Sequence, residues 1–160
     1  MAAFLKIDGI DGEATDKEHK GWIQIESMSA DISRTITAGA RDVERMRGDT
    51  ILGDVAVSRM FDSSSIPLQE CCAKGELKKE MIIHVCTQVR DKQQTYLEYK
   101  LKDVIVSGYD VSATANDKPS ESVHFAYAAV EWTYTELDPR TGNPAGQHPG
   151  AFDPSKNATK

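Results

Sequence analysis

Five carboxylates gather near the amino terminus, in a segment that could bind a cation or transfer protons: Asp8, Asp11, Glu13, Asp16 and Glu18. An EF-hand calcium loop needs oxygen ligands at its first, third and fifth positions, glycine at the sixth and glutamate at the twelfth. A loop that starts at Asp8 places Ile10 third and His19 twelfth. A loop that starts at Asp11 places Asp16 at the glycine position, so neither register predicts a calcium site.

A catalytic carboxylate pair is no better supported by this segment. Such a pair needs burial or like-charge crowding to separate the pKa values of its two members. Lys17, His19 and Lys20 lie among the acids, a mixture that is typical of a solvated loop. We therefore predict an exposed connection between two strands, in which Gly9 and Gly12 permit the turn.

Histidine and cysteine side chains offer a second kind of chemistry. His84 and Cys86 share one face of a predicted strand, and Cys71 and Cys72 lie upstream of it. Zinc sites normally show a C-x2-4-C or H-x3-5-H pair, and adjacent cysteines chelate poorly. The chain also has no G-x-S-x-G, P-loop or G-x-G-x-x-G motif. It is therefore expected to have no metal, no cofactor and no catalytic residue, and not to be an enzyme.

The elements that would position these side chains are mostly strands, because apolar residues alternate with polar ones. The alternating stretches are residues 21–28, 54–61, 80–89, 95–109 and 122–137. A polar turn at residues 90–94 joins two of them into a hairpin. Within 95–109 the apolar parity changes near Lys102 and Asp103, which predicts a bulge or kink that bends the sheet.

One helix is predicted over about residues 63–75. Aspartate and serine residues precede it as N-cap candidates, Pro67 would lie in its first turn, and Gly75 suits its C-terminus. The fold class is therefore mainly β: a small antiparallel β-barrel or sandwich of about seven or eight strands with one flanking α-helix, over residues 1–137.

The last long strand, 122–137, carries apolar groups on both faces, whereas an antiparallel sheet normally shows one face to water. A covering helix or scattered surface apolar residues would explain the pattern. A lateral subunit interface would explain it as well, and its residues would be Ala126, Ala128, Val130, Trp132 and Tyr134.

Two segments lie outside this pattern. Residues 38–53 form a connection that is too long for a hairpin turn, and long ordered loops in compact domains are usually functional. Residues 138–160 are rich in proline and glycine without a period, which predicts an extended or disordered tail.

The overall charge restricts the choice of partner. A net charge of -6 and a pI of about 5.2 argue against nucleic acid or an anionic membrane, because phosphate binding needs a basic surface. No apolar run approaches the ~20 residues that span a bilayer, so no membrane insertion is expected. The N-terminus shows no basic segment followed by an apolar stretch, so the protein is expected to be made in the cytoplasm without a secretory signal peptide.

Three pieces of the chain follow one another in a recognisable order: the acidic turn "GE…DK.H" at 12–19, the helix entry from Asp62 to Leu68, and "LKDVIVS" at 101–107. With this order of segments, residues 3–136 resemble the haemolysin-coregulated protein (Hcp) family, whose members are tube subunits of the bacterial type VI secretion system. The resemblance implies a tight antiparallel barrel with a flanking helix, six subunits in a ring, and rings stacked into a hollow tube.

Further partners follow from the resemblance alone. It implies a spike protein at the tube tip, a contractile sheath, small secreted effectors carried in the lumen, and export through the secretion machine. It also implies that the loop 38–53 contacts the neighbouring ring, and its stacking residues would be Arg41, Asp42, Val43, Glu44, Arg45, Met46 and Arg47. The rival interpretation is a monomeric β-barrel that binds a small ligand in its interior.

Overall fold

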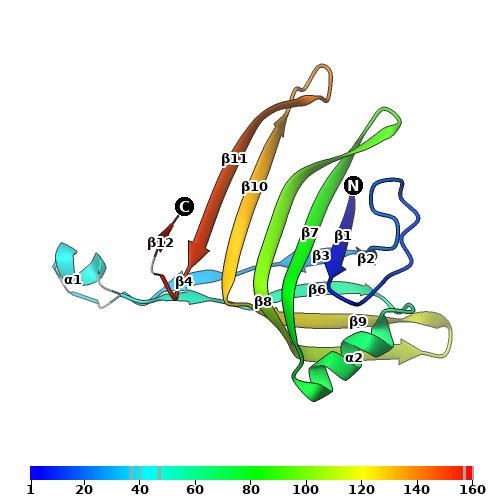
Figure 1. The fold of residues 1–160 in the computed structure, drawn as a ribbon, viewed down its shortest axis with the longest axis horizontal. Helices are drawn as coiled ribbons and strands as arrows, with labels where there is room; N and C mark the ends of the chain where they lie inside the picture. Colours follow the sequence, from blue (N-terminus) through cyan, green and yellow to red (C-terminus); the bar gives the residue numbers. More distant parts are fainter. Residues whose placement is uncertain (37, 40, 47, 157, 160) are drawn as a thin grey trace.

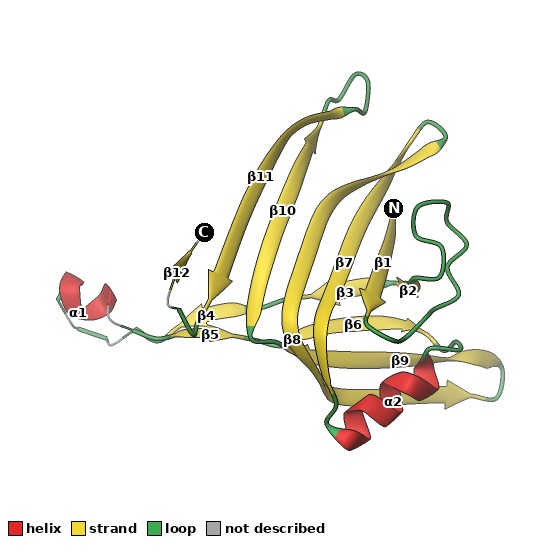
Figure 2. Cartoon of the chain, in the orientation of Figure 1, coloured by secondary structure: helices red, strands yellow, loops and turns green. Residues whose placement is uncertain are grey.

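The structure is a computed structural model of the 160-residue chain, and it describes residues 1–36, 38–39, 41–46, 48–156 and 158–159. Within these residues it is an antiparallel β protein with a flanking helix (Figures 1 and 2). The strands form two layers and a separate two-stranded arm, and one helix lies beside the second layer.

The larger layer consists of long strands that run alongside one another. Its hydrogen-bonded order is β12 (Ala158–Thr159), β11 (Pro144–Asp153), β10 (Ala129–Leu137), β8 (Lys92–Thr114), β7 (Leu77–Val89), β1 (Ala2–Ile7) and β2 (Ile23–Ile25). All of these pairs are antiparallel. Strands β7 and β8 form the predicted hairpin, whose turn is Arg90 and Asp91.

The second layer is formed by the later half of β8 together with three further strands. In order along the layer they are β9 (Asp117–Ala126), β6 (Val55–Met60) and β3 (Ser27–Ser29). Because β2 and β3 are separated only by Glu26, the chain passes from one layer to the other there, and β8 makes the second passage. Among the described residues the ladders do not close into a barrel, so the two layers form a sandwich.

A kink in β8 lets one strand serve both layers. Asp103 has a φ of 52°, a left-handed backbone conformation that is uncommon for a residue other than glycine. Before this residue β8 pairs with β7 and β10, and after it β8 pairs mainly with β9. The change of apolar parity in the sequence therefore predicted a real feature, and its position at Lys102 and Asp103 is confirmed.

Substitutions at Asp103 test this kink. We expect Asp103→Gly to leave the free energy of unfolding unchanged or raise it by about 1 kcal/mol, because glycine adopts positive φ without strain. Asp103→Val should lower it by about 1–2 kcal/mol, because a β-branched side chain is strained there. Urea unfolding measures both effects. Asp110→Val, also exposed on β8 but with ordinary φ, is the control, and an equal loss in the control would contradict the explanation.

The flanking helix α2 (Ser65–Lys74) is confirmed within two residues of its predicted bounds. Gly75 ends it in the left-handed conformation, and its N–H points to the carbonyls of Cys71 and Cys72. Leu68 and Cys71 are buried in the core, and Cys72 packs at its edge. The two cysteines therefore serve as small apolar residues that hold the helix on the sheet.

The core fills the space between the two layers. It includes Leu5, Ile83 and Leu101 from the larger layer and Val57 and Phe125 from the second, each no more than 2% exposed. The predicted long strand 122–137 is in fact two strands, because the chain breaks at Tyr127 and Ala128, opposite the kink in β8. Phe125 before the break and Val130 after it both point into the core, although their positions differ in parity.

The C-terminal segment joins the larger layer. Residues 138–160 contain β11, which pairs antiparallel with β10 from Val130↔Phe152 to Leu137↔Pro144. This strand is difficult to predict from the sequence, because proline and glycine are both uncommon in strand interiors. Pro144 and Pro149 are tolerated here on a strand whose other neighbour is only the two-residue β12.

Candidate functional site

The described residues of the segment 38–53 are not an open loop but the outer part of an arm, which we define as the described residues of 31–53. Strands β4 (Ile32–Arg34) and β5 (Thr50–Leu52) pair antiparallel as a sheet of their own, and α1 (Asp42–Met46) lies at the far end. Figure 1 shows the arm projecting away from the two layers. A hydrogen bond from the Gly53 N–H to the Asp31 carbonyl holds its base, and one from the Thr35 N–H to the Asp49 carbonyl lies at the far end of the β4–β5 pairing.

The arm exposes both charges and apolar groups. Of the predicted stacking residues, Arg41, Asp42, Val43 and Arg45 are exposed. Arg47 lies outside the described residues, as do the side chains of Glu44 and Met46. The predicted stacking set does not include three exposed isoleucines of the same arm, Ile32, Ile36 and Ile51, which are between 50% and 57% exposed; Val43 is 58% exposed. Isolated apolar groups are common on surfaces, and the described part of the arm carries four of them.

The predicted lateral residues do not share one surface. Val130 is 1% exposed and belongs to the core, so its side chain is not free to contact another subunit. Ala128 is exposed at the break between the strands, and Ala126 is half-buried at the end of β9. Only Trp132 and Tyr134 lie together, because the break at 127–128 separates them from the residues before it.

Trp132 and Tyr134 belong to an apolar strip on the inner face of the larger layer. Trp132 pairs across the strands with Tyr99, and Tyr134 pairs with Leu97. Tyr134 is 48% exposed, and its ring stacks on His148 with the ring centres 6.1 Å apart. The strip is partly open because β7, β8, β10 and β11 continue beyond the second layer (Figure 1).

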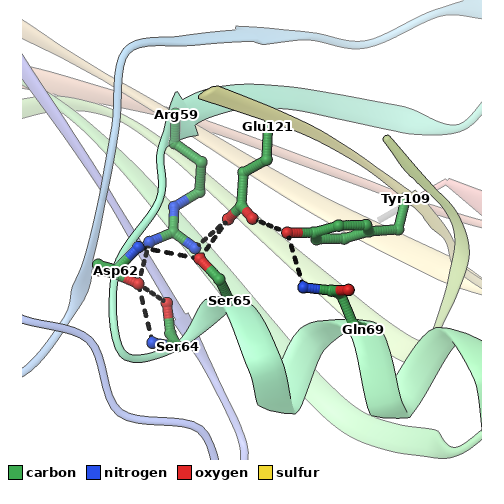
Figure 3. Close-up of polar contacts among 7 residues, drawn as sticks. All are labelled: Arg59, Asp62, Ser64, Ser65, Gln69, Tyr109 and Glu121. Atoms are coloured by element: carbon green, nitrogen blue, oxygen red, sulfur yellow. Dashed lines mark hydrogen bonds and ion pairs between the residues drawn. The ribbon is translucent and has the colours of Figure 1, made fainter. Parts of the chain in front are cut away.

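A buried polar cluster joins α2 to both neighbouring strands of the second layer (Figure 3). Arg59 on β6 lies directly opposite Glu121 on β9, and its Nη1 donates to Glu121 Oε1 at 2.5 Å. The other guanidinium nitrogen, Nη2, forms an ion pair with Asp62. Ser65 at the start of α2 donates to the same Glu121 oxygen at 3.1 Å, and Tyr109 donates to the other oxygen.

This cluster is a buried network of ion pairs and hydrogen bonds, and it does not have the access that a catalytic site needs. Arg59 is 1% exposed and Glu121 3%, so no substrate reaches either group. Burial and the bond to Glu121 raise the pKa of Tyr109 far above its ordinary value. Burial alone would raise the pKa of Asp62, but the bonds from Ser64 and Arg59 outweigh it and the pKa is lowered. Arg59 is thus the counter-ion of both Glu121 and Asp62, and the cluster fixes the helix to the sheet.

The acidic segment near the N-terminus is a connection between β1 and β2, as predicted, and Asp8, Asp11, Glu13 and Glu18 are exposed. A Cβ on Gly12 would overlap the backbone of Trp22 and Ile23, so glycine is required there. The expectation that all its charged groups face water is wrong for His19, which is 2% exposed. His19 stacks on Phe4, with ring centres 4.4 Å apart, and contacts Asp16 and His84.

Two classes of site find no support in the described part of the chain. No group of three or more histidine, cysteine, aspartate or glutamate side chains there is arranged to hold a metal ion. No helix there is both long enough and apolar enough to cross a membrane.

Comparison with known proteins identifies the relatives of this fold. A family model described as "Type VI secretion system effector, Hcp" matches residues 4–134. No curated protein sequence matches the chain significantly.

Solved structures agree with the family model. One described as a type six secretion system protein is 29% identical, covers 99% of both chains and has a TM-score of 0.90. Hcp1 from Salmonella typhimurium is 24% identical, covers 99% of this chain and 98% of its own, and has a TM-score of 0.80. A type VI secretion system effector from Yersinia pestis is 24% identical, covers 94% and 98%, and has a TM-score of 0.72.

Proposed function

We propose a function from the premise that this chain belongs to the Hcp family of type VI secretion system proteins, whose model spans residues 4–134. We infer that the chain is a structural tube subunit and not an enzyme, that six copies close into a ring, and that rings stack into a hollow tube. The family match is the observation that carries this proposal. The sandwich with its arm supports it, because stacked rings need separate lateral and axial contact surfaces.

The lateral contact in this proposal uses the apolar strip of the larger layer. Trp132 and Tyr134 supply it, with Tyr99 and Leu97 as their cross-strand neighbours. Aromatic side chains are enriched at subunit contacts because they bury a large area at a small entropic cost. Ala126 and Ala128 lie beside this contact rather than within it, and Val130 supports it from inside the core.

The axial contact in this proposal uses the arm. Its exposed Arg41, Asp42 and Arg45 would pair with charges on the next ring, and Val43 would be the apolar anchor. Glu44, Met46 and Arg47 belong to the same proposed surface. A projecting arm suits this role because it can reach a neighbouring ring while the sandwich stays in its own.

The remaining partners follow from the proposed tube. A tube of this kind would be capped by a spike protein, surrounded by a contractile sheath, and able to carry small effectors in its lumen on the way out of the cell. The monomeric ligand-binding alternative gains no support, because the space between the layers is filled by side chains such as Ile83, Leu101 and Phe125, each 0% exposed.

Native mass spectrometry tests the ring. A mass of about six times the 17.6 kDa chain supports the proposal, and a monomer at micromolar concentration contradicts it. Electron microscopy of concentrated protein then tests stacking, because stacked rings appear as tubes of uniform width.

Val43→Asp tests the arm. We expect the variant to keep its rings in native mass spectra and to lose tubes in micrographs, because a buried unpaired carboxylate at an axial contact is costly. Val111→Asp is the matched control, since Val111 is 45% exposed on β8, outside the arm. Tubes that persist in Val43→Asp, or that vanish equally in Val111→Asp, would show that the arm is not the specific axial contact.

A further inference from the structure

Four side chains form a continuous chain of hydrogen bonds between the β1–β2 connection and the larger layer. Asp16 Oδ1 lies 2.6 Å from His19 Nδ1, His19 Nε2 lies 2.9 Å from His84 Nδ1, and His84 Nε2 lies 2.6 Å from Glu98 Oε2. We call these four residues the histidine clasp. The connection supplies Asp16 and His19, β7 supplies His84, and β8 supplies Glu98.

The clasp is sheltered from water at its centre. His19 is 2% exposed, and its ring lies against Phe4 on one side and meets the edge of Trp22. Cys86 is fully buried, with its Sγ 4.0 Å from His19 Nε2. The three contacts between the named groups are 2.6, 2.9 and 2.6 Å long, which is hydrogen-bond distance.

A count of protons shows that two neutral histidines cannot satisfy this arrangement. Three hydrogen bonds need three protons, one between each pair of neighbours. Two ionised carboxylates bring none and two neutral imidazoles bring one each, so only two protons are present. If both histidines donate outward to their carboxylates, His19 Nε2 and His84 Nδ1 face each other with two lone pairs at 2.9 Å. Such a contact is repulsive and would not persist.

We propose that the histidine clasp binds one additional proton in the folded protein, held between the two imidazole rings, and that this proton fastens the β1–β2 connection to the sheet. An imidazole is a stronger base than a carboxylate, so the proton belongs to the rings rather than to Asp16 or Glu98. The two imidazole rings then carry one positive charge, which lies between the negative charges of the two carboxylates. The inference depends on the fold alone and is independent of the proposed tube.

The surroundings of the clasp act on the extra proton in opposite directions. The hydrogen bond to His19 lowers the pKa of Asp16, as expected for a carboxylate opposite a positive ring. Burial is the largest influence on His84 and lowers its pKa, the hydrogen bond and charge of Glu98 raise it, and His19 and Lys100 lower it further. Burial therefore opposes protonation of His84, and it is the geometry of the three contacts that favours the extra proton. Burial also raises the pKa of Cys86, which stays a neutral thiol. The remaining charged neighbours are Glu18 of the connection and Lys6 of β1, which lies over the Trp22 ring.

The clasp makes stability depend on pH in two directions. Above about pH 6.5 the unfolded histidines are neutral, while the folded clasp still holds its extra proton, so the folded state binds more protons and loses stability as pH rises. Below that pH the unfolded chain protonates both histidines and the folded clasp resists the second proton, so stability also falls as pH decreases. We therefore expect a maximum near neutral pH.

Urea unfolding between about pH 6.5 and 8.5 tests the proposal. In the wild type we expect the folding equilibrium constant to fall up to about tenfold per pH unit while one proton is released. His84→Gln should remove this slope, because glutamine can donate to His19 without an extra proton. His124→Gln, an exposed histidine on β9, should keep the wild-type slope. Equal slopes in His84→Gln and the wild type would overturn the proposal.

A second measurement covers the case in which His84→Gln does not fold. Nitrogen-15 NMR of histidine-labelled wild-type protein near neutral pH counts the protonated ring nitrogens, and we expect three among the four of His19 and His84. Two protonated nitrogens would contradict the extra proton. So would one equivalent of bound metal per chain by elemental mass spectrometry, because a metal ion would then occupy the place of the proton.

Discussion

Arg59→Met is expected to lower the free energy of unfolding by about 3–5 kcal/mol, because it leaves the Glu121 charge buried without its counter-ion. The side chains of Arg59 and Glu121 are 1% and 0% exposed, so water cannot replace the lost partner. Ser65 and Tyr109 would still donate to Glu121, but two neutral donors do not cancel a buried charge. Helix α2 should loosen first, since Ser65 joins it to the cluster.

Two further variants separate the cost of an unpaired charge from the contribution of the pair. Arg59→Met combined with Glu121→Met should recover part of the lost stability, because it removes the buried Glu121 charge, while Asp62 loses Arg59 but keeps its hydrogen bonds from Ser64. Lys102→Met breaks the exposed pair with Glu131, whose members are 49% and 39% exposed, and should cost less than about 1 kcal/mol. The measurement is urea unfolding at one protein concentration, since subunit association contributes to apparent stability. An equal loss in Arg59→Met and Lys102→Met would contradict the role of burial.

Tyr134→Lys is expected to dissociate the proposed ring into monomers at micromolar concentration. Removing an aromatic anchor at the centre of an interface typically costs at least about 2 kcal/mol at each contact, and a buried lysine adds a desolvation penalty. A closed ring repeats that loss at every subunit boundary. Because Tyr134 is 48% exposed in the single chain, the monomer itself should remain folded.

Thr133→Lys provides the matched control for this experiment. Thr133 neighbours Tyr134 on β10 but points to the opposite face, since side chains alternate along a strand. Its cross-strand partner is Glu98, so a lysine is tolerated there electrostatically. Native mass spectrometry reports the assembly state, and far-ultraviolet circular dichroism reports the fold. If rings survive in Tyr134→Lys, or dissociate equally in Thr133→Lys, the apolar strip is not the specific lateral contact.

Several elements could be predicted from the sequence because their causes are local. The helix α2 follows from a start signal, an apolar face and Gly75, which all lie within one short segment. The β7–β8 hairpin follows from alternation around a polar turn. The kink at Asp103 follows from a change of parity within one strand. The family resemblance likewise depends on the order of such local segments.

The candidate contact surfaces were predicted less well. The sequence pattern grouped Val130 with Trp132 and Tyr134, but only the tertiary structure shows Val130 in the core. The reason is that Val130 packs into the core, whereas Tyr134 on the same strand is 48% exposed. The break at 127–128 depends on the kinked partner strand β8, which no pattern within residues 122–137 records.

The acidic connection shows the same division between local and tertiary causes. By itself, the sequence determined that residues 8–22 join two strands, that Gly9 and Gly12 shape the turn, and that no calcium loop fits. Only the tertiary structure decided that His19 turns inward onto Phe4, and that it meets His84, a residue 65 positions away in the chain. Local patterns determine turns and strands because their energies depend on neighbours in sequence. The ionisation of a side chain depends on neighbours in space, and the fold alone supplies those.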